Sequence, residues 1–471
     1  MADLCIKHDS VADFGKATIW LPSKASVEQA RVAPVSDLPP SYEQAQHLCA
    51  FRAYAHRNEE MARLIIVEWE EPGQCDLQVM TQVVTDHLRR HDTYHSWFED
   101  RGDALVRHVL SDPKSIQMEP TPLGEMGLDD WRNQAMATPA PFEWDCFRFG
   151  ILQRETGFTC FACIDHLHAD MSVVPLLLQE VHAAYRALTD GALPLRIASA
   201  ARYMDYCTNQ RLRTAKMTLA DPGVAEWVAF LQRNRGRMPA FPLALGLLED
   251  RCLADYVTLD ILDHTGAAAF AYACEASGAR MLGGLLACAA LTERALAGNG
   301  RYSVVTPAST RKSPQAFRMA GWCMGVVPID FDVDAQAFPT LAATAQRIFE
   351  ERLPLADTPI ERVLELAADL PTIRPVATGG VMLSYTDADR LPSNPHLARV
   401  WQQVNGRTYV NRGMAAQVAI WFVRTQRGLS LMASYPANEI ARTSMTNYVE
   451  MFQNICRQVA GASTPARVGR R

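Results

Sequence analysis

Hydrophobic positions along the chain alternate between helical and strand spacing. Apolar residues at 174–188 recur with helical spacing, and two apolar runs at 146–153 and 158–165 flank a turn at 154–157, which predicts a β-hairpin followed by a helix. Further strands are expected at 64–67, 256–262, 302–306, 324–331, 379–385, 415–425 and 428–434, and further helices at 42 onward, 79–90, 265–277, 280–297, 338–353, 358–368 and 437 onward. Because both halves mix strands and helices in similar amounts, the pattern predicts an α/β (α+β) protein with two comparable lobes.

Segments rich in proline, glycine and polar residues indicate where the lobes begin and end. Ser41 and Ser172 each precede an expected helix and are predicted to cap it. The predicted division is an irregular arm at 1–33, an N-terminal lobe at 34–205, a connector at 206–250, a C-terminal lobe at 251–461 and a frayed tail at 462–471.

Composition narrows the class of protein. A net charge of -6 argues against a nucleic-acid partner, and 48% hydrophobic with 21% charged residues is ordinary globular composition. The sequence shows neither a membrane-spanning apolar stretch nor a signal peptide, so a cytoplasmic location is expected. Cys160 and Cys163 have C-x-x-C spacing, but residues three apart on a strand point to opposite faces and cannot share a metal ion.

Polar residues cluster where the second hairpin strand gives way to the helix, in the segment Cys163-Ile164-Asp165-His166-Leu167-His168-Ala169-Asp170-Met171. Three chemistries compete for it. His166, His168 and Asp170 match the H-x-H-x-D core of metal-dependent hydrolases, yet no recognisable further ligand motif follows. A serine hydrolase would need G-x-S-x-G, which does not occur. A single neutral histidine can instead act as the general base of an acyl transfer.

The same segment resembles the H-H-x-x-x-D-G motif of condensation domains and BAHD acyltransferases. Asp165 takes the place of the first histidine, His166 and Asp170 match, and Met171 replaces the glycine, which suggests a different backbone turn there. Similar phrases lie at 39–48, 87–98, 144–150, 306–311 and 321–328. The chain looks most similar to the mycobacterial polyketide-associated acyltransferases that acylate trehalose.

That resemblance implies two chloramphenicol-acetyltransferase-like lobes with an active-site tunnel between them and His166 as the base. Apart from the resemblance, an aspartate four residues after the base can lock the loop by pairing with an arginine, and this is the role expected of Asp170. The resemblance also implies an acyl-CoA or a phosphopantetheine thioester on a polyketide synthase carrier as donor, and trehalose or a related sugar as acceptor. Neither a cofactor nor a metal is expected, and the protein is expected to lack a membrane span but to work beside the inner membrane. An alternative is a catalytically silent module that docks on a polyketide synthase.

Other residues receive secondary roles. Arg311, Trp322 and Gln417 are candidates for substrate binding, and Arg311 is open to pairing with Asp170, contact with phosphopantetheine or a surface position. His168 is expected to be structural or to lie on the acceptor side. His87, His91 and His95 recur every four residues, but a helix end near His91 predicts capping or surface roles. Restoring the family pair with Asp165→His is expected to be tolerated.

Overall fold

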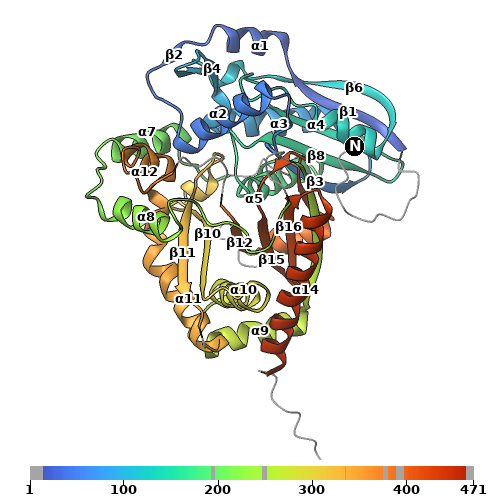
Figure 1. Ribbon diagram of the computed structural model, residues 1–471. Helices are drawn as coiled ribbons and strands as arrows, with labels where there is room; N and C mark the ends of the chain where they lie inside the picture. Colours follow the sequence, from blue (N-terminus) through green and yellow to red (C-terminus); the bar gives the residue numbers. More distant parts are fainter. Residues whose placement is uncertain are drawn as a thin grey trace, which may run out of the picture. The chain divides into compact units, whose positions relative to one another are not determined.

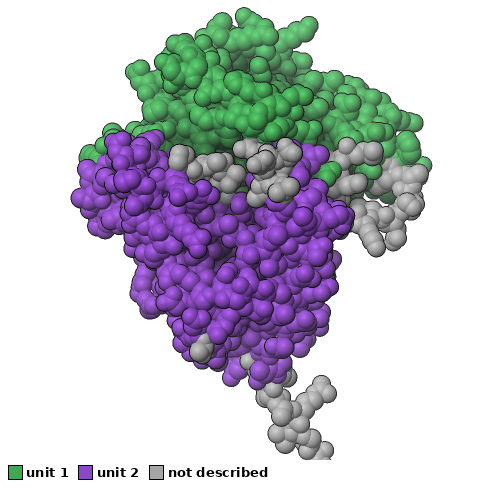
Figure 2. Space-filling view, viewed as in Figure 1, with its two compact units in different colours: residues 1–216, 311–323, 390–413 green, residues 217–310, 324–389, 414–471 purple. Residues whose placement is uncertain are grey.

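The computed structural model describes residues 14–192, 197–246, 252–334, 336–374, 380–388 and 397–462. The chain divides into two compact units (Figure 2): unit 1 comprises residues 1–216, 311–323 and 390–413, and unit 2 comprises 217–310, 324–389 and 414–471. Two segments from the second half of the sequence therefore belong to the first unit. A linear division at 34–205, 206–250 and 251–461 does not express this exchange.

Unit 1 is built on an antiparallel sheet whose two faces are both covered by helices. Its described elements are β1 (Phe14–Pro22), α1 (Lys24–Arg31), β2 (Val35–Ser36), α2 (Tyr42–His56), β3 (Leu64–Pro72), α3 (Leu77–Arg90), η1 (Asp92–His95), β4 (Ser96–Asp100), β5 (Leu105–Val109), η2 (Pro113–Ser115), β6 (Met118–Gly127), α4 (Leu128–Met136), β7 (Phe147–Gln153), β8 (Gly157–Asp165), α5 (Val173–Leu177), η3 (Leu178–His182), α6 (Ala183–Thr189), α7 (Tyr203–Thr214), η4 (Ala316–Arg318), α13 (Leu397–Gln403) and β13 (Arg407–Val410). The described strands form a six-stranded sheet in the order β13-β3-β8-β7-β1-β6 and a small sheet β2-β5-β4.

Strand β8 lies inside the larger sheet, paired antiparallel with β3 and β7. Its alternate residues enter two different cores: Cys160 packs with α3 and α5, whereas Cys163 packs with α4 on the opposite face. This confirms that the C-x-x-C pair does not converge. Burial on both faces fixes the register of β8, since a one-residue slip would exchange its two cores. The end of β8 is therefore a rigid position from which to present a side chain.

Unit 2 is built on a sheet that contains both parallel and antiparallel strand pairs. Its described elements are α8 (Pro222–Arg233), β9 (Cys252–Asp263), α9 (His264–Ala276), α10 (Met281–Ala297), β10 (Arg301–Ser309), β11 (Met324–Asp332), α11 (Phe338–Arg352), η5 (Leu353–Asp357), α12 (Ile360–Leu366), β12 (Met382–Asp387), β14 (Met414–Ala415), β15 (Ala419–Thr425), β16 (Gly428–Pro436) and α14 (Glu439–Ala462). The described strands order as β11-β10-β12-β15-β16-β9-β14, and β12 runs parallel to β10 and β15. Helices α9, α10, α11 and α14 share the main core with this sheet, while α8 and α12 pack in a second core (Figure 1).

Most expected elements are present, and three expectations are wrong. The segment 14–31 is not an irregular arm: β1 pairs with β6 and β7, and Ser23 caps α1. The expected connector contains most of α7 and all of α8. Ser172 precedes a helix but makes no capping hydrogen bond, because it has helical rather than extended dihedrals. Most of the expected tail, 463–471, lies outside the described residues. No helix in the described part of the chain has both the length and the hydrophobicity needed to cross a bilayer.

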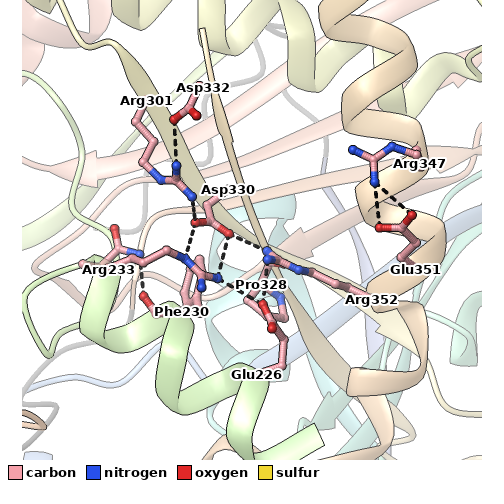
Figure 3. Close-up of polar contacts among 11 residues, drawn as sticks. Glu226, Phe230, Arg233, Arg301, Pro328, Asp330, Asp332, Arg347, Glu351 and Arg352 are labelled. Carbon is pink, nitrogen blue, oxygen red and sulfur yellow. Dashed lines mark hydrogen bonds and ion pairs between the residues drawn. The ribbon is translucent and has the colours of Figure 1, made fainter. Parts of the chain in front are cut away.

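A cluster of charged side chains joins α8, β10, β11 and α11 within unit 2 (Figure 3). Asp330 on β11 accepts hydrogen bonds from Arg233, Arg301 and Arg352, and Glu226 accepts from Arg233 and Arg352. Burial opposes ionisation of Asp330, but the three arginines outweigh it and lower its pKa to about 2. One buried carboxylate thus ties together four elements.

Asp330→Ala is expected to destabilise the protein by roughly 3 kcal/mol, because it leaves three arginines without their shared partner. The exposed pairs Arg301–Asp332 and Arg347–Glu351 in the same region provide controls: Asp332→Asn and Glu351→Gln should each cost less than about 1 kcal/mol.

Since folding lowers the pKa of Asp330 from about 4 to about 2, the stabilisation is present above about pH 4 and is lost as the pH falls toward 2. Urea unfolding of the wild type and the three variants from pH 7 to pH 3 measures both the stability lost in each variant and the pH dependence of the Asp330 contribution. Equal losses in all three would contradict this role.

Candidate active site

The candidate site begins where β8 ends. The Asp165 N–H donates to the Cys146 carbonyl at 3.0 Å, and the His166 N–H donates to the Arg63 carbonyl at 2.7 Å, so the neighbouring strands fix the backbone up to His166. The Asp165 carboxylate then accepts from the Leu167 N–H at 2.9 Å and holds the turn that follows. The loop is therefore rigid before the helical segment starts.

His166 lies against the indole of Trp322, with 3.8 Å between ring centroids, and the residue is only partly buried. Its Nδ1 is buried without a regular hydrogen bond, and no hydrogen bond to its Nε2 occurs among the described residues. Burial, followed by the charge of His47, lowers the pKa of His166 below its ordinary value. A neutral imidazole with a free nitrogen is the form that a general base requires.

Asp170 is fully buried and bonded on both oxygens. Oδ2 accepts from Arg311 Nη1 at 2.7 Å and from the Cys323 N–H at 2.9 Å, while Oδ1 accepts from the Ser172 N–H at 2.9 Å. Burial opposes ionisation of Asp170, but the Arg311 guanidinium and these hydrogen bonds outweigh it and lower its pKa. Of the roles left open for Arg311, the structure shows the pairing with Asp170, as a buried ion pair.

Arg311 in turn organises the segment that carries Trp322. Its guanidinium donates to the carbonyls of Met319 and Gly321 at 3.3 and 2.9 Å. Gly321 has φ +147°, and a Cβ there would come within 2.2 Å of the Tyr203 ring, so glycine is required at this close approach. The Asp170–Arg311 pair thereby connects the His166 loop to the main chain on either side of Trp322.

Met171 stands where the family motif has glycine. Its φ is not in the left-handed region, so this loop does not require glycine, and its side chain is 48% exposed.

His168 faces away from His166. Its Nδ1 lies 3.1 Å from Thr93 Oγ1, its ring packs against Tyr94 and Phe147, and its Nε2 is buried without a partner. The donor atoms of His166, His168 and Asp170 do not converge into a possible metal site within the described part of the chain. Gln417 lies in unit 2, where its Oε1 accepts from the Phe241 N–H at 3.4 Å. A substrate role for Gln417 stays a prediction.

The prediction of surface or capping roles for His87 and His91 is wrong. Both are buried and donate to Glu180 Oε2, at 2.9 and 2.8 Å, while Arg90 donates to Oε1. They converge because His91 directly follows the last residue of α3 and keeps its ring close to that of His87. The third histidine of the repeat, His95, approaches the Arg89 carbonyl at 3.0 Å instead.

Among the described residues, His87, His91 and Glu180 form the group whose ligand atoms lie close enough together to hold a metal ion. The hydrogen bonding argues for a different role. The Ala320 N–H points at His91 Nδ1 at 3.3 Å, so the ring proton is on Nε2, the atom that a metal would need. We therefore interpret His87, His91, Arg90 and Glu180 as a hydrogen-bonded network in which Glu180 carries the negative charge.

The environment of Asp165 is not evident from the sequence. This carboxylate is fully buried and pairs with His47 Nε2 at 2.7 Å and with Arg63 Nη1. Burial opposes its ionisation, but these two partners outweigh it and lower the pKa of Asp165 to about 2. A buried carboxylate at the end of a strand signals a need for cationic partners, but the sequence does not say which residues supply them.

With this environment known, we no longer expect Asp165→His to be tolerated. A histidine at 165 would face His47 and Arg63, and it would leave Arg63 without its carboxylate partner. We expect a loss of roughly 3–5 kcal/mol of stability, visible as a lower melting temperature in differential scanning fluorimetry. Asp129→His, at an exposed carboxylate of the same unit, is the matched control and should melt like the wild type. An unchanged melting temperature for Asp165→His would show that the buried pair is dispensable.

Comparison with known proteins places this arrangement in a family. The condensation domain model matches residues 65–389. The chain belongs to the condensation-domain family. Trehalose-2-sulfate acyltransferase PapA2 of Mycobacterium tuberculosis is 38% identical over 457 residues, covering 97% of both proteins. A 2'-acyl-2-O-sulfo-trehalose (hydroxy)phthioceranyltransferase PapA1 of Mycobacterium bovis is 37% identical over 456 residues, covering 97% of this chain and 88% of that protein.

A solved structure gives the same result for the fold. The structure of PapA2 acyl transferase superimposes with a TM-score of 0.92 at 38% identity, covering 96% of this chain and 98% of that chain. The predicted fold class and the predicted family are thereby confirmed, and this condensation-domain protein is an acyltransferase. The tunnel expected between the lobes stays a prediction.

Proposed function

We propose that the protein transfers a long-chain fatty or polyketide acyl group from a thioester to a hydroxyl of trehalose or a sulfated trehalose, in the synthesis of a cell-envelope glycolipid. The observation that carries this proposal is a neutral, partly exposed His166 on a loop fixed by the Asp170–Arg311 pair. The acceptor is inferred from the near full-length similarity to proteins named for acylating trehalose 2-sulfate and its 2'-acyl form.

The proposed step needs one histidine. His166 removes the proton from the acceptor hydroxyl as that oxygen attacks the thioester carbonyl carbon. The carbonyl carbon forms the new C–O bond and loses its bond to sulfur, and the leaving thiolate takes the proton from the imidazolium. The products are an ester and a free thiol, so no metal or other cofactor enters the balance.

The donor is proposed to be an acyl-CoA or the phosphopantetheine thioester of a polyketide synthase carrier, and the reaction is proposed to take place in the cytoplasm beside the inner membrane. A silent docking module would not need an intact base. The packing of Trp322 on His166 and the complete bonding of Asp170 favour an active enzyme.

A competition assay tests the acceptor. Purified protein is given palmitoyl-CoA and an equimolar mixture of trehalose 2-sulfate, trehalose, glucose and a fatty alcohol, and the products are measured by mass spectrometry. The two trehalose acceptors are expected to be acylated faster than glucose or the alcohol. Equal rates for all four acceptors would reject trehalose as the specific acceptor, while leaving acyl transfer itself in place.

A further inference from the structure

A second imidazole lies beside the proposed base, on helix α2. Ser41 and Gln44 form a capping box at the start of this helix, which fixes its first turn. Gln44 Nε2 then donates to the Leu167 carbonyl at 3.0 Å, and His47, three residues later on the same face, reaches Asp165. Helix α2 is thus bonded to the catalytic loop on both sides of His166.

The rings of His47, His166 and Trp322 form one cluster. His47 meets the Trp322 indole edge-on, with 5.6 Å between centroids and an interplanar angle of 78°. The same indole lies on His166 at 3.8 Å, and the two imidazoles are 6.4 Å apart. His47 therefore limits the movement of the aromatic surface against which His166 packs.

The charge at His47 also acts on His166. After burial, His47 is the strongest influence that lowers the pKa of His166, whereas Asp170 and Asp165 raise it. Asp165 and Arg63 carry opposite charges, so the pair alone nearly cancels at His166. Any net positive charge beside the base therefore depends on whether the His47 ring carries a second proton.

We propose that His47, held by Asp165, is a positioning residue for the acyl-transfer base: it fixes the Trp322 indole against His166, and whenever its ring is protonated it adds a positive charge next to that base. The inference rests on the proposed function of His166 as base. It predicts that His47 keeps His166 in the neutral form and in one orientation, without itself touching the reacting atoms.

Several charged groups of unit 1 lie in the network around His166. They come from the helix α2, the residue before β3, the end of β8, the following loop and the segment after β10: His47, Arg63, Asp165, Asp170 and Arg311. Arg63 and Arg311 are each paired with a carboxylate of the set, so His47 is the member whose removal changes the net charge without leaving an arginine unpaired.

Two substitutions should move the titration of His166 in opposite directions. His47→Gln retains an amide that can donate to Asp165 but removes the charge, so the His166 midpoint should rise by roughly 0.5–2 pH units. Asp165→Asn removes a negative charge that raises the pKa of His166, so the midpoint should fall. His56→Gln, at an exposed position on the same helix, should leave it unchanged.

The experiment is an NMR titration of protein labelled with ¹³C at histidine Cε1, with the His166 signal assigned from its loss in His166→Gln. This readout does not depend on turnover, so failure of the proposed acceptor or donor cannot be confused with failure of the inference. The acid limb of the pH profile of kcat/KM, measured with the best acceptor, should shift in the same directions.

An unchanged His166 midpoint in His47→Gln would overturn the proposal. If Asp165→Asn does not fold, His47→Lys replaces it: a lysine retains the positive charge without the ring, and the midpoint should stay close to that of the wild type. A rise in His47→Lys equal to that in His47→Gln would show that the charge of His47 plays no part and would also overturn the proposal.

Discussion

Replacing His166 with alanine is expected to lower the rate of acyl transfer about 10²–10⁴-fold, which is the usual contribution of a positioned general base. The side chain is partly exposed and its nitrogens make no regular hydrogen bond to the described residues, so the fold should be little affected. The measurement is the rate of thiol release from palmitoyl-CoA in the presence of trehalose 2-sulfate, together with the melting temperature. His56→Ala, at an exposed histidine of the same unit, is the control.

Full activity of His166→Ala would contradict the mechanism. A loss of activity accompanied by a large drop in melting temperature would instead assign His166 a structural role, since the fall in rate would then follow from a damaged loop.

Asp170→Ala is expected mainly to lower the stability of the fold. Asp170 and Arg311 are both buried, with 2% of each side chain exposed, and removal of one partner leaves an unpaired buried charge at a cost of roughly 3–5 kcal/mol. Activity should fall as well, because the pair holds the main chain around Trp322. The double variant Asp170→Ala/Arg311→Ala should lose less stability than the sum of the two single variants, because neither charge is then left alone.

Melting temperatures and soluble yields of the three proteins measure this coupling. An unchanged melting temperature in Asp170→Ala, together with lost activity, would move Asp170 from a structural role into the chemistry.

The sequence predicted the elements that local pattern determines. The β7–β8 hairpin, the helix after Ser41 and the helices of the second half follow from apolar periodicity and capping residues, and the structure has them at closely similar bounds. The position of His166 at the end of a strand follows from the same pattern. The pairing of Asp170 with an arginine was expected from its place four residues after the base, and pairing with Asp170 was one of three roles left open for Arg311.

What the sequence did not predict depends on contacts between distant segments. The 14–22 segment has only one short apolar run, at 17–21, and it becomes a strand because β6 and β7 lie on either side of it. His47 and Asp165 are 118 positions apart, and only the packing of α2 on the loop brings them together. Likewise, Glu180 bonds to His87 and His91, which lie about 90 positions earlier in the chain. Buried polar groups require partners, but their identity is fixed by tertiary structure.

The central claim is that this condensation-domain protein acylates a trehalose hydroxyl by direct transfer with His166 as the base. The most direct test is mass spectrometry of one quenched reaction containing palmitoyl-CoA and trehalose 2-sulfate, in which both the acceptor and the intact protein are weighed. The account predicts acceptor heavier by one acyl group, protein of unchanged mass, and, with His166→Ala, product lowered about 10²–10⁴-fold and no adduct on the protein. An acyl adduct on the protein, or equal product from His166→Ala, would contradict it.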